Sequence, residues 1–231
     1  MRGVDRCEGV PLPFWGRVFY SMCPMEKALR IVIATRNKNK LAELKRILAD
    51  VPVRLEGLDE HPGCPEVEET GETFVENACL KASQVAKCAG LHAIADDSGL
   101  EVDALGGAPG VFSARYAGPG ANDRKNMEKL LHELEGVPAG KRTARFRAVI
   151  ALAAPDGHII ETFQGRAEGT IGFRPEGENG FGYDPLFYPL GHESTFAQMG
   201  PARKDAMSHR GEALRLLKQF LMSKIPSLLK L

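Results

Sequence analysis

The sequence predicts an α/β protein with a mixed β-sheet. A continuous run of β-favouring residues at positions 29–35 is followed by apolar residues at helical spacing, which indicates a strand, a loop and a helix in succession. Farther along, residues 142–171 contain two long strand-like segments separated by Pro155-Asp156-Gly157, a strong hairpin signal. Strands that alternate with helices, together with an antiparallel hairpin, favour a mixed sheet over a uniformly parallel one.

The first strand and the first helix follow each other closely. Residues 29–35 (LRIVIAT) show no regular alternation of apolar and polar side chains, so we expect a strand that is covered on both faces. Residues 40–50 then carry apolar side chains at helical spacing. These are Leu41, Leu44, Ile47 and Leu48.

The second helix is bounded by capping signals at both ends. Thr73 and Glu76 form a capping box for a helix over residues 74–89. Gly90 stands where a C-terminal cap belongs. A short apolar strand ending at Ala95 is expected to follow this helix.

The two ends of the chain differ from its middle. Residues 1–24 are apolar in part, but two prolines and an arginine interrupt them, so they predict neither a membrane helix nor a signal peptide. We expect a loosely attached extension there, a folded domain over residues 25–224 and a short tail over residues 225–231. Ser208 is the expected N-cap of a last helix over residues 209–224.

Composition narrows the class of protein. A length of 231 residues predicts one large domain or two small ones. Thirty basic and thirty acidic residues balance, so the overall charge indicates neither a nucleic-acid polymer nor a membrane as partner. The five cysteines are odd in number and include no Cys-x-x-Cys pair, which argues against a disulfide framework and a structural zinc. We therefore expect a reduced, cytoplasmic protein.

Residues 94–99 (IADDSG) place Asp96 and Asp97 side by side where the short strand is expected to end. One interpretation is a solvated turn, because Asp, Ser and Gly are common between elements. The other is a divalent cation site, because a bound cation keeps adjacent carboxylates ionised. These residues alone leave both open.

The loop before the first helix concentrates positive charge and amide groups. Backbone N–H groups and the helix dipole at a helix N-terminus favour an anion, so this loop suits a phosphate chain. A polar turn with an asparagine cap is the alternative, and the sequence contains no P-loop pattern. The residues concerned are Thr35, Arg36, Asn37, Lys38, Asn39 and Lys40.

Three further segments carry candidate functional side chains. Glu69 precedes the second helix, and Lys81 lies on it, so that Lys81 could point toward a bound anion; a solvated acidic turn and a solvated lysine are the alternatives. In residues 177–187, glycines allow close approach of a ligand, and aromatic rings offer faces for a planar base; a hairpin turn in which Asp184 caps its own backbone is the alternative. Residues 203–211 collect Lys204, His209 and Arg210, for which a helix start with a basic, solvated face is the alternative. The candidates in the last two segments are Phe181, Gly182, Tyr183, Asp184, Lys204, His209 and Arg210.

Together these segments resemble the inosine triphosphate pyrophosphatase family, which hydrolyses non-standard purine nucleoside triphosphates such as ITP, dITP and XTP. Five separated motifs occur in the family's order over residues 29–220, which makes a chance match very improbable. The motifs are ATRNKNK, EETGETFVENACLKA, IADDSGLEVDALGGAPGVFSARYAG, GFGYDPLF and SHRGEAL. The resemblance implies a two-lobed α/β fold with a long central mixed sheet flanked by helices, a homodimer and a requirement for Mg²⁺.

The resemblance also implies roles for residues of this sequence. Glu69 and Asp97 would bind the metal, and Asp97, with Asp96 beside it, would fill the position of the general base. Residues 35–40, Ser98 and Lys81 would line the phosphates. The base and the far end of the substrate would be held by Phe181, Gly182, Tyr183, Asp184, Lys204, His209 and Arg210. Three positions depart from the family's usual residues, namely Arg36, Gln198 and Asp205.

The implied reaction is hydrolysis of the triphosphate to a nucleoside monophosphate and pyrophosphate, which would cleanse the nucleotide pool. Magnesium and the basic side chains would neutralise the phosphates so that water can attack. Two alternatives remain at this point. One is the base specificity of the related Maf-type nucleotide pyrophosphatases, and the other is a sensor that binds nucleotides without hydrolysing them.

Overall fold

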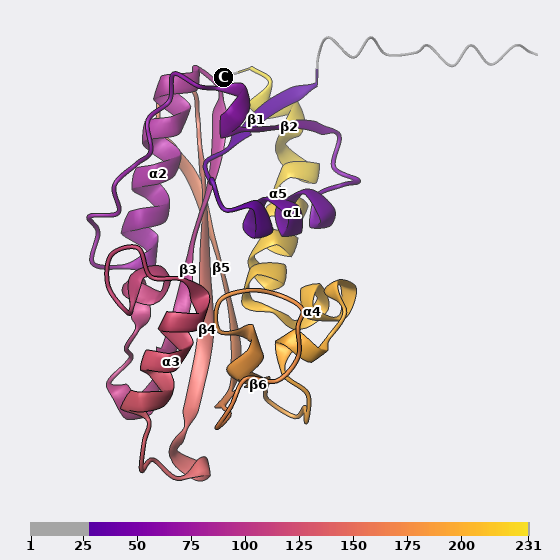
Figure 1. The fold of residues 1–231 in the computed structure, drawn as a ribbon. Coiled ribbons are helices and arrows are strands. Elements are labelled where there is room, and N and C mark those ends of the chain that lie inside the picture. The colour runs from indigo at the N-terminus through magenta and orange to yellow at the C-terminus, as the bar shows by residue number, and fades with distance from the viewer. Residues whose placement is uncertain (1–27, 231) are drawn as a thin grey trace, which may run out of the picture.

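A computed structural model describes residues 28–230, so the predicted extension at residues 1–24 lies outside the described residues. The strands form one six-stranded sheet in the order β2-β1-β3-β4-β5-β6 (Figure 1). β1 pairs in parallel with β2 and β3, and the remaining pairs are antiparallel. The predicted mixed sheet is therefore confirmed. The strands are β1 (Leu29–Ile33), β2 (Val53–Gly57), β3 (His92–Val102), β4 (Thr143–Ala153), β5 (Ile159–Ile171) and β6 (Phe187–Pro189).

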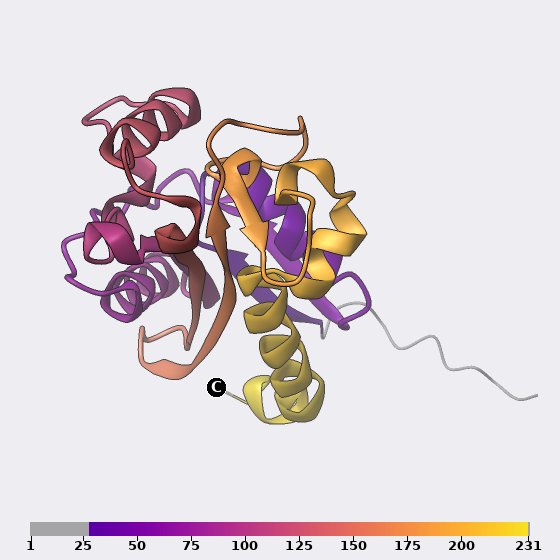
Figure 2. The same ribbon diagram turned by 90° about the horizontal axis from the view of Figure 1, so that it is seen from below.

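Helices cover both faces of this sheet. α2 and α3 lie on one side, and α1, α4 and α5 lie on the other, as Figure 2 shows from below. The long strands β3, β4 and β5 extend past α2 and α5 to the region of α3 and β6, so they join two lobes (Figure 1). The helices are α1 (Lys38–Ile47), α2 (Phe74–Ala89), α3 (Asp123–Glu133), α4 (Pro201–Met207) and α5 (His209–Leu228).

Three apolar clusters hold the layers together. Ile31 and Ile33 of β1 pack with α1 and α5 on one face, while Val32 and Ala34 pack with α2 on the other. The strand is covered on both faces as expected. A third cluster, which includes Leu130 of α3, fills the second lobe. Within residues 28–230 no helix is both long and apolar enough to cross a membrane.

The predicted caps are present. The Thr73 side chain accepts a hydrogen bond from Glu76 N, and Gly90 ends α2 in the left-handed conformation with φ 63°. Ser208 Oγ accepts from Gly211 N at 3.0 Å and caps α5. This last helix is longer than expected, because it continues to Leu228, which is buried against the first apolar cluster. Residues 225–228 are therefore helix and not tail.

The prediction that a short strand ends at Ala95 is wrong. β3 continues to Val102, with Asp96 opposite Ile150 and Asp97 opposite Val149 of β4. Because successive side chains of a strand point to opposite faces, the two carboxylates are directed away from each other. Each is neutralised by cations from distant parts of the chain, so neither carboxylate ends the strand.

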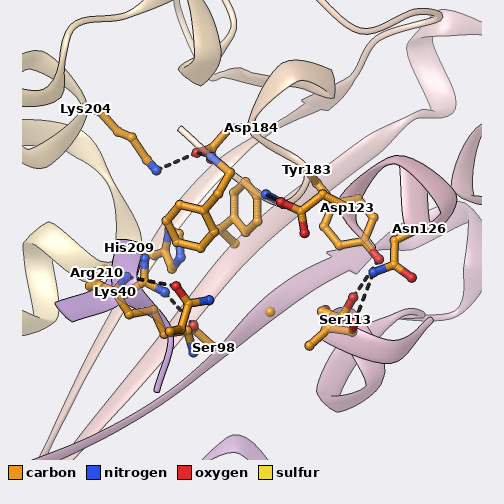
Figure 3. A pocket seen from close by; sticks show the side chains of 16 residues that line it. Lys40, Ser98, Ser113, Asp123, Asn126, Tyr183, Asp184, Lys204, His209 and Arg210 are labelled. Carbon is orange, nitrogen blue, oxygen red and sulfur yellow. Dashed lines mark hydrogen bonds and ion pairs between the residues drawn. The ribbon is translucent and has the colours of Figure 1, made fainter. Parts of the chain in front are cut away.

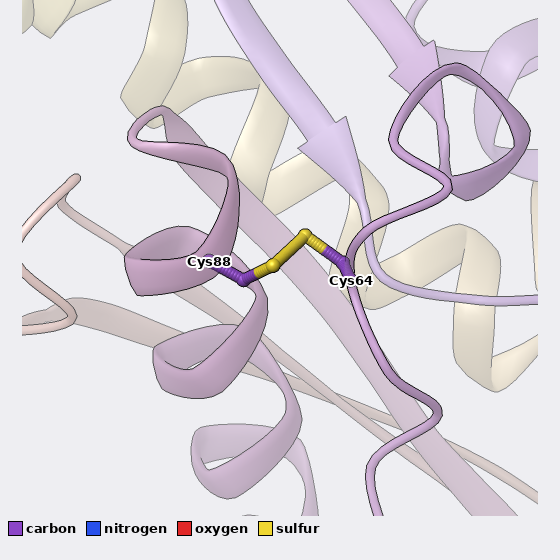
Figure 4. Close-up of a disulfide and its surroundings, with 2 residues drawn as sticks. All are labelled: Cys64 and Cys88. Carbon is purple, nitrogen blue, oxygen red and sulfur yellow. A yellow bond between two sulfur atoms is a disulfide. The ribbon is translucent and has the colours of Figure 1, made fainter.

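The prediction from the cysteines is also wrong in part. Cys64 and Cys88 form a disulfide with their Cα atoms 5.6 Å apart (Figure 4). This bond ties the segment that follows β2 to the last turn of α2. Cys79 is a free thiol. An odd count does not exclude one bridge, since the pairing depends on which segments the fold brings together.

Candidate active site

Two connected hollows open beside the middle of β3. We call the first the aromatic pocket; it has a volume of about 110 Å³ (Figure 3). We call the second the charged groove. Asn37, Lys40 and Ala114 line both, so the hollows form one continuous cleft. The aromatic pocket is further lined by Phe146, Phe181, Tyr183, His209 and Arg210, and the charged groove by Thr35, Arg36, Glu69, Lys81 and Arg115.

The loop before α1 is both a helix cap and part of the cleft. Asn37 Oδ1 accepts hydrogen bonds from Asn39 N at 2.9 Å and Lys40 N at 3.2 Å, so the asparagine cap is real. Thr35, Arg36, Asn37 and Lys40 nevertheless line the charged groove. Lys38 and Asn39 are exposed and line neither hollow.

Asp96 is buried on the face of β3 that α1 and α5 cover. Arg210 Nε donates to Asp96 Oδ2 at 3.0 Å, and Lys40 Nζ lies 2.5 Å from Asp96 Oδ1. Ser98, on the same face, donates to Asp96 Oδ1 at 3.0 Å and accepts from Arg210 Nη2 at 2.6 Å. Burial alone would raise the pKa of Asp96, but Arg210 and Lys40 outweigh it and lower that pKa. Asp96 is thus an ionised anchor for two cations.

Asp97 lies on the opposite face, toward α2. Lys81 Nζ donates to Asp97 Oδ1 at 3.1 Å, to Glu69 Oε1 at 2.6 Å and to the Asp96 carbonyl at 2.9 Å. One ammonium group therefore bridges Glu69 and Asp97, which are 28 positions apart. Burial raises the pKa of Asp97, whereas at Glu69 the cations of Lys81 and Arg115 outweigh burial and lower the pKa.

The two carboxylates fit a divalent cation. Asp97 Oδ2 is buried and has no hydrogen-bond partner among residues 28–230, so one ligand oxygen is available. Carboxylate oxygens are the donors that Mg²⁺ prefers, and Mg²⁺ usually keeps waters and substrate phosphates as its other ligands. No group of three or more His, Cys, Asp or Glu side chains is placed to hold a metal in that described part of the chain. The protein would therefore supply two ligands, and Lys81 stands between them.

The aromatic pocket is built from the segment before β6 and the start of α5. The rings of Phe146 and His209 stack with centroids 4.7 Å apart and planes 9° from parallel. Lys204 Nζ lies 4.7 Å from the centroid of the Phe181 ring. Tyr183 Oη donates to the Ser113 carbonyl at 2.9 Å, which fixes the tyrosine to the opposite wall.

Asp184 holds this wall in place. It accepts hydrogen bonds from Phe181 N at 2.9 Å and from Lys204 Nζ at 2.5 Å. Gly182 adopts φ 62°, which a side chain would disfavour, and its N–H donates to Asp123 Oδ2 at 2.7 Å. Asp184 therefore orders its own loop, as one interpretation of the sequence held, and also anchors Lys204.

Glu43 of α1 is a buried residue that the sequence analysis missed. It accepts from Lys204 Nζ at 2.9 Å and from Arg210 Nη1 at 2.6 Å. An alternating chain of buried charges results, and it joins the two hollows. Glu43 stands three positions after Lys40, and this spacing on one helix face was the signal available. This series of ion pairs, here called the ion-pair network, connects Asp184, Lys204, Glu43, Arg210, Asp96 and Lys40 in that order.

The three departures from the family's usual residues do not disrupt this arrangement. Arg36 is exposed and lines the charged groove. Asp205 forms an ion pair with Arg46 at 2.5 Å outside both hollows, and Gln198 Oε1 accepts from Thr195 N at 2.8 Å. Only Arg36 therefore bears on ligand binding.

Comparison with known proteins identifies the family. A sequence model described as the Ham1 family matches residues 31–220. The chain belongs to the Ham1 family. This confirms the resemblance drawn from the motifs, because relatives of this chain carry the name dITP/XTP pyrophosphatase.

Two such relatives match this Ham1 chain over almost their whole length. The dITP/XTP pyrophosphatase of Geobacter sulfurreducens is 54% identical over 192 residues, 83% of this chain and 96% of that protein. The one of Desulforamulus reducens is 50% identical over 193 residues, 84% of this chain and 96% of its own. A solved HAM1 protein from Coxiella burnetii superposes with a TM-score of 0.78 at 46% identity, covering 84% of this chain and 99% of that one.

Proposed function

We propose that this Ham1 protein hydrolyses non-standard purine nucleoside triphosphates, such as dITP, XTP and ITP, to the nucleoside monophosphate and pyrophosphate. One observation carries the proposal: the aromatic pocket shares lining residues with the charged groove, and Lys81 of that groove holds Glu69 and Asp97 together. The activity named for relatives at 54% and 50% identity supports it. Removal of deaminated purines from the nucleotide pool is the corresponding cellular role.

The substrate would lie along the whole cleft. The base would stack in the aromatic pocket on Phe181, since a ring face and the nearby cations suit a planar, polar heterocycle. The triphosphate would pass Asn37 and Lys40, which line both hollows, and extend into the charged groove. Helix α1 would then present its N-terminus to the phosphates.

Mg²⁺ is the proposed cofactor, held by Glu69 and Asp97. Bound there, it would supply charge neutralisation at the phosphates and lower the pKa of a coordinated water. Lys81 now donates to three acceptors, two of which are the carboxylates of Glu69 and Asp97. It would exchange one of these acceptors for a phosphate oxygen. Lys40, anchored by Asp96, would hold the phosphates near the pocket.

Asp97 is the proposed general base. A water would add to the α phosphorus, and the bond from that phosphorus to the oxygen shared with the β phosphorus would break. Pyrophosphate would leave with the electron pair, and the water's proton would pass to Asp97 and then to solvent. The raised pKa of Asp97, caused by burial, brings that carboxylate closer to the pH at which it would accept a proton.

Selectivity for 6-oxo purines has a candidate donor in His209. Burial, then the neighbouring cations Arg210 and Lys204, lower the pKa of His209 well below its ordinary value, so the ring is neutral and carries one N–H donor. Its Nδ1 is buried and has no hydrogen-bond partner in the described chain. A donor aimed at the 6-position would accept hypoxanthine or xanthine and mismatch adenine, which can discriminate by about 10⁴-fold.

A homodimer and a cytoplasmic location belong to the same proposal. Nucleoside triphosphates are cytoplasmic metabolites, which supports the location. Phe112 is 57% exposed beside a third hollow that Val75 and Val149 also line, and such a surface suits a second copy of the chain. Light scattering would test this: Phe112→Ser should yield monomer, whereas Phe173→Ser, a matched exposed aromatic elsewhere, should not.

The experiment that tests the function is a panel of nucleoside triphosphates incubated with MgCl₂, with pyrophosphate and orthophosphate quantified separately. The proposal expects pyrophosphate from dITP, XTP and ITP, little turnover of ATP and GTP, and no orthophosphate. Orthophosphate as first product, preference for a standard nucleotide, or binding without turnover would contradict it.

A further inference from the structure

Arg115 is a cation of the charged groove to which neither the sequence motifs nor the reaction above gives a role. It ends the short 3-10 helix Gly110–Arg115, and its side chain is 40% exposed. Its guanidinium carbon lies 5.2 Å from the centroid of the Phe112 ring, which supports the side chain from one side. The group is therefore held at the groove and is still open to solvent.

The single charged partner of Arg115 among residues 28–230 is Glu69. Arg115 Nη1 donates to Glu69 Oε2 at 3.0 Å, while Lys81 holds the other oxygen, Oε1. Lys81 is 11% exposed and keeps two further acceptors on β3 if Glu69 is withdrawn. Arg115 keeps none. A cation that takes Glu69 Oε2 would therefore release Arg115 into the groove.

The position of Arg115 within the cleft indicates which phosphates it would meet. Asn37, Lys40 and Ala114 line both hollows and so mark the junction, whereas Arg115 lines only the charged groove. A triphosphate whose base occupies the aromatic pocket would place its first phosphate at the junction. The following two phosphates, which become the leaving group, would lie beyond it, on the side of Arg115.

We propose that Arg115 is a further catalytic residue, which binds the leaving pyrophosphate once Glu69 engages the metal. The inference rests on the proposed function. The planar guanidinium binds two phosphate oxygens at once, so it neutralises the charge that builds on the leaving group as the bond between phosphorus and bridging oxygen breaks. Arg115 transfers no proton, because a guanidinium stays protonated in proteins.

Product inhibition tests this assignment directly. Inorganic pyrophosphate and dIMP are titrated as inhibitors of dITP hydrolysis by the wild type, Arg115→Gln and Arg115→Lys. Loss of a charged hydrogen-bond donor should raise the inhibition constant for pyrophosphate about 10- to 100-fold in Arg115→Gln and leave that for dIMP within about twofold. Arg115→Lys should fall between, since it keeps the charge and loses the fork.

A matched control and a second readout separate this role from a structural one. Arg124→Gln removes an arginine that is also paired with one glutamate but lies on α3 with its side chain 84% exposed, and it should match the wild type. The Mg²⁺ concentration for half-maximal rate should not rise in Arg115→Gln, because Arg115 competes with the metal for Glu69. A rise of that concentration, or equal weakening of pyrophosphate and dIMP, would overturn the proposal, as would an unchanged inhibition constant for pyrophosphate.

Failure of the proposed function looks different. In that case the wild type itself releases no pyrophosphate from dITP. Calorimetric titration of inorganic pyrophosphate with MgCl₂ into the wild type and Arg115→Gln then decides about Arg115 alone. The assignment requires weaker binding by the variant, and equal binding would refute it.

Discussion

The two hollows of the cleft differ in how their charges are satisfied. In the ion-pair network behind the aromatic pocket, each charged side chain from Asp184 to Lys40 has a partner of opposite sign. In the charged groove, Lys81 is shared between Glu69 and Asp97, and Asp97 Oδ2 has no partner in the described chain. The charges of the first hollow are therefore paired without a ligand. The second leaves one carboxylate oxygen, Asp97 Oδ2, unpaired beside Lys81, and a cation would pair with it.

This difference separates two tasks of one site. A fully paired network fixes side-chain positions before a ligand arrives, because any displacement would expose a buried charge. An unpaired carboxylate oxygen costs free energy when the site is empty and gains a partner when it binds. We infer that the pocket selects the base and that the groove performs the chemistry.

The largest expected effect is on the groove's chemistry. Asp97→Asn keeps an oxygen for Lys81 but removes the base and a charged metal ligand. Hydrolysis of dITP should fall by about 10³-fold or more. Pyrophosphate release measures the loss, and an unchanged circular dichroism spectrum and melting temperature are expected. Substantial turnover by this variant would remove the proposed distinction between the two hollows.

The next effect concerns the paired network. Glu43→Gln leaves Lys204 and Arg210 with one carboxylate each and an excess of buried positive charge. The free energy of unfolding should fall by about 3 kcal/mol, as measured by urea denaturation. Glu128→Gln is the matched control, because Glu128 is exposed and, within residues 28–230, forms an ion pair only with Arg124. Equal stability of both variants would contradict a pre-formed pocket.

The disulfide connects the two segments that carry Glu69 and Lys81, which line the charged groove. Cys64 precedes the segment that carries Glu69, and Cys88 lies in the last turn of the helix that carries Lys81, at a sequence separation of 24. Cys88→Ser should lower the free energy of unfolding by about 3 kcal/mol, because a loop of this length is no longer closed in the unfolded state. Cys79→Ser, a variant of the free thiol, should change it far less. An unchanged free energy of unfolding in Cys88→Ser under oxidising conditions would show that the bridge does not form.

The smallest effect is a pH dependence of stability. Burial lowers the pKa of both His209 and His92 below the ordinary value of about 6.5. Below about pH 6.5 these histidines are protonated in the unfolded chain but remain neutral in the folded chain. The free energy of unfolding therefore falls as the pH falls, by at most about 1.4 kcal/mol per histidine and pH unit. Urea denaturation between pH 7.5 and pH 5.5 should show a shallower loss for His209→Gln than for the wild type. His132→Gln, at an exposed position, should behave as the wild type does.

Local signals in the sequence predicted local structure well. The capping box at Thr73, the glycine at position 90 and the hairpin around Gly157 each act through their neighbours in the chain, and each is present in the structure. Residues of several motifs also line the two hollows, although the motif around Asp96 and Asp97 lies within β3 and not at a strand end.

Features that depend on distant partners were not predictable in this way. The strand β3 passes through Asp96 and Asp97 because Arg210, Lys40 and Lys81 neutralise them, and nothing near the aspartates announces those cations. The Cys64–Cys88 bond and the contact between Arg115 and Glu69 are of the same kind. Each is a consequence of topology and not of spacing.

The central claim is that Glu69 and Asp97 bind one divalent cation together. Direct titration with Mn²⁺, a paramagnetic substitute for Mg²⁺, followed by electron paramagnetic resonance, tests it without substrate turnover. The account predicts one site in the wild type, with affinity weakened at least tenfold by Glu69→Gln and by Asp97→Asn, and little further loss when both are changed. Unaltered Mn²⁺ affinity in either single variant, or losses that add as for independent sites, would contradict it.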